Sequence, residues 1–523
     1  MTTPISTGES GLPHSAAREL GHTRALSLLP LVVLVLTSLL IAGYALWYTS
    51  AGRFPAFPAI QNDYVDLGKA FLRGELALPE QPDPRLAELG NPYEYTQRKG
   101  IPYHWDASYH NGKYYLYWGP VPALISAGLQ LITGTSPASV LVFLPYLGLL
   151  VVAAVLLWQL AGVFGDSARW AVWLFVIMGF FSFPMLFTIG QPRHYQASIM
   201  TGQFFLVLGV LGVAGYARSR HAPWLILSGL SWGLALGSRY NLAVSIAAYL
   251  LIFSIWLLRD GLPMLFRGLA HIAVPFALCL FALGLYNLAR FGDPLETGLT
   301  YQLTIPEFRQ ISYSTAYVPS GLYIYLLYPL TGGSSFPFIQ SAHFRPSLLP
   351  GTLIIPDGRE FDQITFGLLP TVPVVWLLVI LFPLIIGWRA LHKASRTQAP
   401  SPSWFRLVIS MLAVGAAGQF LFLLVFFYVA ERYVVDFYVP LILCLAVVVW
   451  SAHAALRGRP IVQVALWVVA VLLTAWTVGI GYFACFGVPV LVSLYYDPAM
   501  LARLGEFWNA RYAALSSVLP GAR

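Results

Sequence analysis

A series of apolar runs, each roughly 20 residues long, limits most strongly what this chain can fold into. A helical run of that length matches the hydrocarbon core of a bilayer. Such runs recur along most of the 523 residues. The composition agrees, because 58% of the residues are hydrophobic and 10% are charged, whereas soluble domains average about 25% charged residues. The sequence therefore predicts an all-α, polytopic transmembrane protein.

About eleven of these runs are candidate spans, with boundaries that pattern alone places only to within a few residues. They cover residues 26–48, 138–163, 169–189, 197–217, 222–238, 241–258, 265–289, 366–388, 405–428, 433–451 and 461–484. The polar residues 1–24 predict a disordered cytoplasmic tail. Residues 25–486 form the expected membrane domain, with long loops at about 49–137 and 290–365, and 487–523 form a short tail.

One further apolar segment, Trp118–Gly134, is not counted as a span, and the charge pattern is the reason. Without it, 13 of the 30 Lys and Arg residues, but only four of the 22 Asp and Glu residues, lie on the side of the N-terminus. The positive-inside rule makes that side cytoplasmic. We expect a juxtamembrane or re-entrant helix at 118–134, a multi-pass protein of the cytoplasmic membrane, and both long loops outside. The basic residues then signal orientation, and no nucleic-acid partner is expected.

The first outer loop opens with two acidic residues, Asp63 and Asp66. Tyr64, Leu67 and Ala70 follow helical spacing, which predicts an amphipathic helix on the outer leaflet with both carboxylates nearer water. Three residues apart, the carboxylates share a helix face. They can serve as a general base, as ligands of a divalent cation (Mg²⁺ or Mn²⁺) or as a clamp for sugar hydroxyls. The alternative is that one caps the helix and the other is solvated.

Later in the same loop come His104, Trp105 and Asp106, followed by Tyr115 and Trp118. Asp106 can orient a histidine or bind hydroxyl groups, and the aromatic rings can stack on a sugar or an isoprenoid. An ordinary loop turn is the competing interpretation.

Arginines recur at four outer helix ends: Arg193 (followed by His194), Arg239, Arg290 and Arg432. A single arginine at a helix end can simply extend its head group to the interface. Four at one depth suit a lipid-linked phosphate, because guanidinium groups bind phosphate through paired hydrogen bonds.

These segments resemble the polytopic glycosyltransferases of the GT-C fold, which include the protein O-mannosyltransferases and the lipid A aminoarabinose transferases. The resemblance rests on short patches within a similar overall organisation. They are Asp63 with 64–74, Asn111–Pro122, the segment 286–298 with its candidate substrate ligand Glu296, and 431–437.

The resemblance implies a polyprenyl-phosphate-sugar donor, a hydroxyl acceptor on a glycan, lipid or protein, and inverting transfer on the outer face. It also implies a catalytic aspartate in the first outer loop, which corresponds to Asp63. Many members have an acidic pair at this point, whereas Tyr64 follows Asp63 here. Asp66 and Asp106 therefore stay open as the second carboxylate or the base.

Two other functions compete with this one. A lipid-linked oligosaccharide ligase or polymerase would use the same surface with a diphosphate donor. A transporter or flippase would place ionisable groups near the middle of the bilayer in repeated halves, but the charges here gather at the outer boundary and no repeat is visible. No sequence motif fixes a cofactor.

Overall fold

A computed structural model describes residues 14–54, 56–304, 313–340, 344–361, 366–391, 401–487 and 497–518. Eight of the described helices are long and apolar enough to cross a membrane. They are α1 (His14–Thr49), α5 (Ala138–Ala161), α9 (His194–Ser219), α11 (Ala243–Leu258), α12 (Leu262–Phe291), α16 (Ser403–Val425), α17 (Val435–Ala455) and α18 (Pro460–Phe486). The predicted all-α polytopic fold is confirmed by these helices.

The other three predicted spans are helical but do not each form one long helix. The segment predicted at 169–189 begins at the last residue of α6 (Asp166–Arg169) and contains α7 (Val172–Phe180) and α8 (Phe183–Ile189). The chain bends by 56° before α8, which has a proline in its first turn. The span predicted at 222–238 contains α10 (Pro223–Leu236). The span predicted at 366–388 is divided among α14 (Leu368–Thr371), the short helix η7 (Pro373–Val375) and α15 (Trp376–Leu391). The described residues thus give eight spans, or nine with the bent pair, where eleven were predicted.

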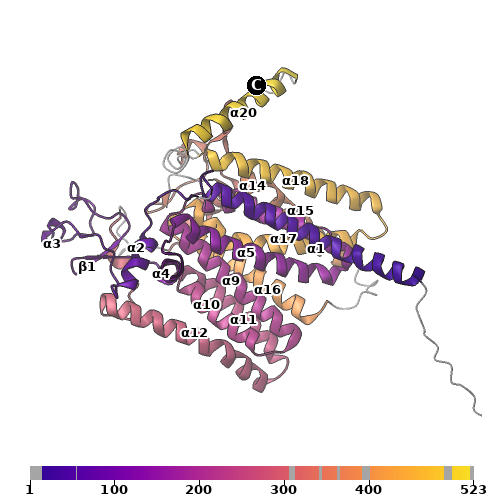
Figure 1. The fold of residues 1–523 in the computed structure, drawn as a ribbon, viewed down its shortest axis with the longest axis horizontal. Coiled ribbons are helices and arrows are strands. Elements are labelled where there is room, and N and C mark those ends of the chain that lie inside the picture. Colours follow the sequence, from indigo (N-terminus) through magenta and orange to yellow (C-terminus); the bar gives the residue numbers. More distant parts are fainter. Residues whose placement is uncertain are drawn as a thin grey trace, which may run out of the picture.

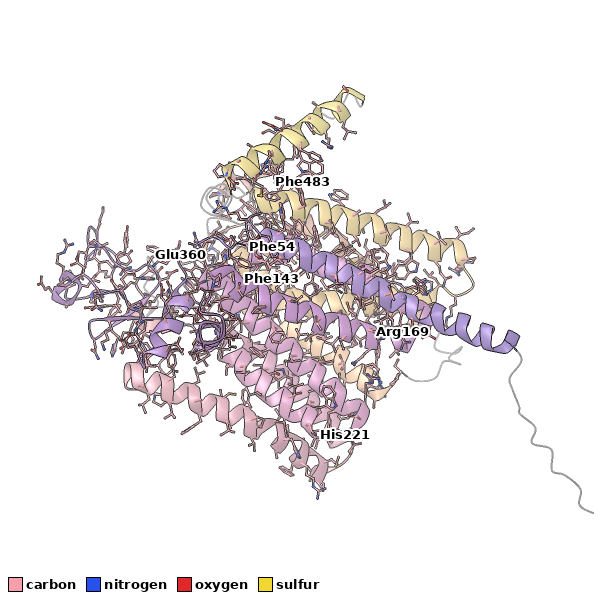
Figure 2. All side chains as sticks on the ribbon, viewed as in Figure 1. Phe54, Phe143, Arg169, His221, Glu360 and Phe483 are labelled. Atoms are coloured by element: carbon pink, nitrogen blue, oxygen red, sulfur yellow. The ribbon has the colours of Figure 1, made fainter. Side chains whose placement is uncertain are left out.

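The helices pack into one bundle, with the first outer loop at one end of it (Figure 1). α9 and α17 are the most buried of the long helices, while α1, α12 and α18 lie at the periphery. Arg169 and His221, which belong to predicted cytoplasmic loops, lie at the other end (Figure 2).

The first outer loop contains α2 (Asp63–Leu72), α3 (Arg85–Glu88) and the hairpin β1 (Ser108–His110) with β2 (Lys113–Tyr115). Asn62 begins α2, because its side-chain oxygen accepts a hydrogen bond from the backbone N–H of Tyr64 at 2.9 Å. The hairpin turns at Asn111 and Gly112, both with positive φ, as a tight two-residue turn requires.

The segment expected to be a juxtamembrane or re-entrant helix contains α4 (Val121–Thr133). Its 13 residues span about 20 Å, less than the roughly 30 Å of a hydrocarbon core. α2 packs on α4 through Gly68, where an added Cβ would lie 2.8 Å from the Ser126 Cβ. This contact corrects one expectation: Asp63 is only 6% exposed, because the start of α2 is packed into the protein and not laid on the leaflet with Asp63 near water.

The second outer loop and the C-terminal segment complete the description. The second loop holds α13 (Val318–Leu327) and the pair β3 (Thr331–Gly332) and β4 (Ile339–Gln340), while β5 (Glu360–Phe361) pairs with β6 (Tyr428–Val429). The segment predicted as a C-terminal tail contains the helix α20 (Pro498–Val518). Of the predicted N-terminal tail, residues 1–13 lie outside the described part, and α1 begins at His14.

Candidate active site

Asp63 lies between two histidines that come from distant parts of the chain. Its Oδ1 is 3.2 Å from Nε2 of His104, in the loop before β1, and its Oδ2 is 2.8 Å from Nδ1 of His194, at the start of α9. All three side chains are largely buried. Asp63, predicted as a base, and His194, predicted as a phosphate ligand, are therefore direct neighbours.

The histidines change the acidity of this carboxyl group. Burial alone would raise the pKa of Asp63, but the charge of His194 and the hydrogen bonds from both rings outweigh burial and hold the pKa well below its usual range. Asp63 is therefore ionised across the physiological range. A carboxylate held in this way is a weak base, because its negative charge is already stabilised by its neighbours.

His104 has a second carboxylate partner, Glu80, whose Oε2 lies 2.5 Å from Nδ1. Burial lowers the pKa of His104, but the hydrogen bond and charge of Asp63, followed by those of Glu80, raise it to about 9. The result is a row of alternating charges from Glu80 through His104 to Asp63. Glu80 was missed by the sequence analysis, because it stands in a proline-rich, charged segment without a recognisable pattern.

Asp106 forms a second polar cluster next to the first. It accepts hydrogen bonds from the Tyr195 hydroxyl and, at 3.1 Å, from Nε2 of Gln302. Its φ is +62°, an uncommon conformation for a residue other than glycine. Since His194 and Tyr195 are consecutive, the first turn of α9 contacts both Asp63 and Asp106.

Aromatic rings cover this turn of α9. Trp118 is 5% exposed, and its ring centroid lies 4.5 Å from that of His194 and 5.0 Å from that of Tyr195. The guanidinium carbon of Arg432 lies 4.6 Å from the Tyr195 ring centroid, a cation–π distance. Arg432 thus packs against Tyr195, a member of the Asp106 cluster.

Arg239 is engaged by a carboxylate. Its Nε and Nη2 donate to both oxygens of Asp436 at 2.7–3.1 Å, and Asn241 donates to the same carboxylate at 2.8 Å. Arg239 is 7% exposed and Asp436 is 1% exposed. In this arrangement the charge of Arg239 is balanced within the protein.

Arg290, at the end of α12, is held by neutral groups. It is 4% exposed and donates to the Leu116 carbonyl and, at 2.7 Å, to Oδ1 of Asn287. Its guanidinium carbon lies 3.8 Å from the Tyr286 ring centroid. Among the described residues Arg290 makes no ion pair, and its Nε has no hydrogen-bond partner. A buried cation without a counter-ion is a natural place for an anionic ligand.

The remaining predicted residues lie outside these clusters or have local roles. Asp66 pairs with Lys69 at 3.2 Å near the surface, and Trp105 is 47% exposed. Glu296 accepts hydrogen bonds from the backbone of Gly298 and the Thr300 hydroxyl, which shapes its own loop. Arg193 is the N-cap residue of α9 and is partly buried.

Two adjoining hollows lie beside these clusters. An apolar groove of about 410 Å³ lies between α2, α4, α10 and α12, where its lining includes Leu124, Ala282 and Tyr286. A cavity of about 550 Å³ adjoins it and is polar, with Arg73, Glu80 and Lys113 among its lining residues, together with Tyr115. Gly74, Glu75 and Leu76 line both hollows.

Arg290 lies beside both hollows, although it is not among the lining residues of either. The ring on which its guanidinium stacks, Tyr286, lines the groove, while the preceding residue, Ala289, lines the cavity. An apolar groove and a polar cavity therefore adjoin each other, with a buried cation that has no ion-pair partner among the described residues next to both. This arrangement matches a molecule with an apolar chain, a negative charge and a polar head.

The arrangement does not fit a divalent cation. Within the described ranges no group of three or more His, Cys, Asp or Glu side chains has the arrangement of a metal site. Both oxygens of Asp63 face imidazole nitrogens, and an imidazolium would repel a metal ion. The reaction proposed below therefore does not use the Mg²⁺ or Mn²⁺ ion that the sequence left as one option for the carboxylates.

No protein-family model matches the chain, and no curated protein matches it. Among solved structures, the chain is similar to the oligosaccharyltransferase of Archaeoglobus fulgidus in the apo form, with 14% identity, a TM-score of 0.48, and 88% of this chain and 56% of that chain covered. The present chain thus spans little more than half the length of that protein. It is also similar to ArnT from Cupriavidus metallidurans bound to undecaprenyl phosphate, with 13% identity and a TM-score of 0.41. That match covers 87% of the present chain and 76% of the ArnT chain.

Proposed function

We propose that the chain is a membrane glycosyltransferase that moves a sugar from a polyprenyl-phosphate donor to a hydroxyl acceptor. The order of groove, Arg290 and polar cavity is the observation that supports this most strongly, because it matches the order of chain, phosphate and sugar in such a donor. The resemblance of the sequence to GT-C glycosyltransferases supports the same function.

In this proposal the isoprenoid chain lies in the apolar groove. The groove is bounded on one side by α12, whose exposed apolar residues, such as Phe281 and Leu285, would face lipid. The chain can enter from the bilayer without leaving an apolar environment.

The donor phosphate lies at Arg290, and the sugar extends into the polar cavity. As the bond between the sugar and the phosphate breaks, negative charge builds up on the leaving phosphate, and a preorganised guanidinium stabilises it. Tyr115, which lines the cavity, offers an aromatic face for the sugar. Reaction on the outer side of the cytoplasmic membrane follows from the charge asymmetry of the loops.

The acceptor hydroxyl must lose a proton as its oxygen attacks the anomeric carbon from the face opposite the phosphate, which inverts that carbon. A carboxylate takes such a proton in inverting glycosyl chemistry. The sequence predicts Asp63 for this task, with Asp66 and Asp106 left open, and Asp63 is the buried end of the row that runs through His104 to Glu80. We assign the task to this row of charged residues.

The test has a chemical arm and a binding arm. A deletion strain should lack an envelope glycan or glycolipid that the wild-type gene restores, and should accumulate a polyprenyl-phosphate sugar, as measured by mass spectrometry. Purified protein in lipid nanodiscs should bind undecaprenyl phosphate. Arg290→Gln should weaken that binding by about 10-fold or more, whereas Arg503→Gln, an exposed site on α20, should not. An unchanged envelope in the deletion strain would refute the proposal.

A further inference from the structure

Of the carboxylates in the charged row, Glu80 is the one that a substrate can reach. Its side chain is 47% exposed and lines the polar cavity, whereas the side chain of Asp63 is 8% exposed. Asp63 also has an imidazole nitrogen against each of its oxygens. Glu80 uses only Oε2 for His104, and the structure gives its Oε1 no partner among the described residues.

His104 fixes Glu80 in position. One ring nitrogen contacts Glu80 and the other contacts Asp63, so the ring cannot turn without breaking one of the two contacts. Asp63 is anchored in turn by His194 at the start of α9. A rigid helix end therefore supports a side chain that belongs to an irregular loop.

The other acidic residue of the cavity is engaged differently. Glu75 accepts two hydrogen bonds from Arg73, at 2.8 and 3.1 Å, and both side chains are about half exposed. This pair depends on no buried residue. Glu80 alone combines access to the cavity with a buried support.

We infer that Glu80 is the catalytic base of the proposed transfer, and that His104 and Asp63 are positioning residues that hold it toward the polar cavity. This inference rests on the proposed function. It differs from the sequence prediction, which names Asp63 as the base and leaves Asp66 and Asp106 open for that role.

The step balances as follows. The acceptor oxygen forms a bond to the anomeric carbon while its proton passes to Oε1 of Glu80. The bond from the anomeric carbon to the phosphate oxygen breaks, and its electron pair stays on the phosphate, beside Arg290. The products are the glycosylated acceptor, the polyprenyl phosphate and a protonated Glu80, which returns the proton to water in the open cavity.

The decisive variant is Glu80→Gln, which keeps the size of the side chain but cannot take a proton. The control is Glu88→Gln, which changes an exposed residue on α3 in the same loop. Each variant is returned to the deletion strain, and the glycan or glycolipid that the wild-type gene restores is quantified. Purified variants are tested for melting temperature and for binding of undecaprenyl phosphate.

We expect Glu80→Gln to bind undecaprenyl phosphate like the wild type and to melt only slightly below it, because a half-exposed ion pair contributes about 1 kcal/mol or less. Its initial rate of product formation should be at least about 100-fold lower, the usual contribution of a general base. Glu88→Gln should restore full product. Wild-type product formation by Glu80→Gln overturns the assignment. If that variant fails to fold, Glu80→Asp decides, because it keeps the charge but withdraws the carboxylate by one methylene, and undiminished product again overturns it. If the wild-type gene itself restores nothing, the proposed function has failed instead.

Discussion

Arg239 and Asp436 form a buried, two-pronged ion pair that joins the end of α10 to the first turn of α17. They are 197 residues apart in the sequence. Since α17 is the most buried of the long helices, the pair fixes the C-terminal end of α10 against the centre of the bundle. Arg239 therefore has a structural partner at the depth where the sequence predicted a phosphate ligand.

Replacing one member of this pair should lower the free energy of unfolding more than replacing both members. Arg239→Met or Asp436→Leu alone leaves a buried charge unpaired, and each should destabilise the fold by about 3 to 5 kcal/mol. The double variant should recover most of that loss. Thermal melting of the purified variants in detergent measures the coupling, and additive effects of the two substitutions would contradict it.

The same double variant separates the two roles of Arg239. If Arg239 only supports the fold, the double variant keeps undecaprenyl phosphate binding once stability has recovered. A stable double variant that loses binding would instead make Arg239 a ligand, as the sequence predicted.

Asp63 and Asp66 provide a matched comparison within one helix. Asp63→Asn removes the charge that two buried histidines face, and should lower the free energy of unfolding by about 2 to 4 kcal/mol. The loss is smaller than for the strongest buried ion pairs, because a histidine that loses its partner can release its proton and become neutral. Asp66→Asn only breaks a surface contact with Lys69 and should cost about 0 to 1 kcal/mol. Equal melting temperatures for the two variants would show that the histidine contacts of Asp63 do not stabilise the protein.

The stability of the protein should fall as the pH rises from about 6.5 to 9. The pKa of His104 is about 9 in the fold, against about 6.5 in an unfolded chain. The protonated ring, which faces Glu80 and Asp63, therefore contributes its full stabilisation below pH 6.5 and loses it as the pH passes through 9. His104→Gln should melt at a lower temperature at pH 6.5 and show a shallower decline above it. A decline equally steep in this variant would assign the pH dependence to other groups.

Asp63 determines how the stability of the protein changes with pH at acidic pH. Its pKa lies below its usual range in the fold, so its contribution is present above the unfolded value of about 3.9 and is lost as the pH falls below it. Asp63→Asn should flatten the acid limb of the melting profile. It should also reduce the loss between about pH 6.5 and 9, leaving only the smaller part that comes from the pairing of Glu80 with His104.

The helices could be predicted from the sequence because their signals are local. A long apolar run is helical in a bilayer whatever surrounds it, and all eleven predicted spans contain helix. The short helix α4 could be placed because the charges of later loops exclude a full span. The bend before α8 and the short length of α10 were not predicted, because tertiary packing decides where an apolar helix ends.

The candidate site could be predicted only in part, because its contacts join distant segments. Asp63, His104 and His194 could each be selected as polar residues near apolar runs, but nothing in the sequence places the histidines on opposite oxygens of Asp63. Asp106 and Tyr195 meet only because α9 begins beside the first loop. Glu80 carries no local signal at all, since its importance comes from His104 and from the cavity it lines.

Blocking the apolar groove should prevent the lipid from binding without disturbing the fold. Ala282 lines the groove on α12 and is exposed, so Ala282→Phe would place a ring in the channel without overfilling the protein core. Ala277→Phe is the matched control, because Ala277 is exposed on the same helix and does not line this groove. Both substitutions add the same apolar surface toward lipid and should leave the melting temperature close to that of the wild type.

The two variants should differ in binding. Ala282→Phe should weaken the binding of undecaprenyl phosphate by about 10-fold or more, since a few buried methylenes of the chain are worth roughly 0.8 kcal/mol each. Ala277→Phe should bind like the wild type. Because a free phosphate ion does not need the groove, the dissociation constant of inorganic phosphate should be the same in both variants. Equal lipid binding by the two variants would mean that the isoprenoid lies elsewhere, and that the order of groove, arginine and cavity does not describe the donor.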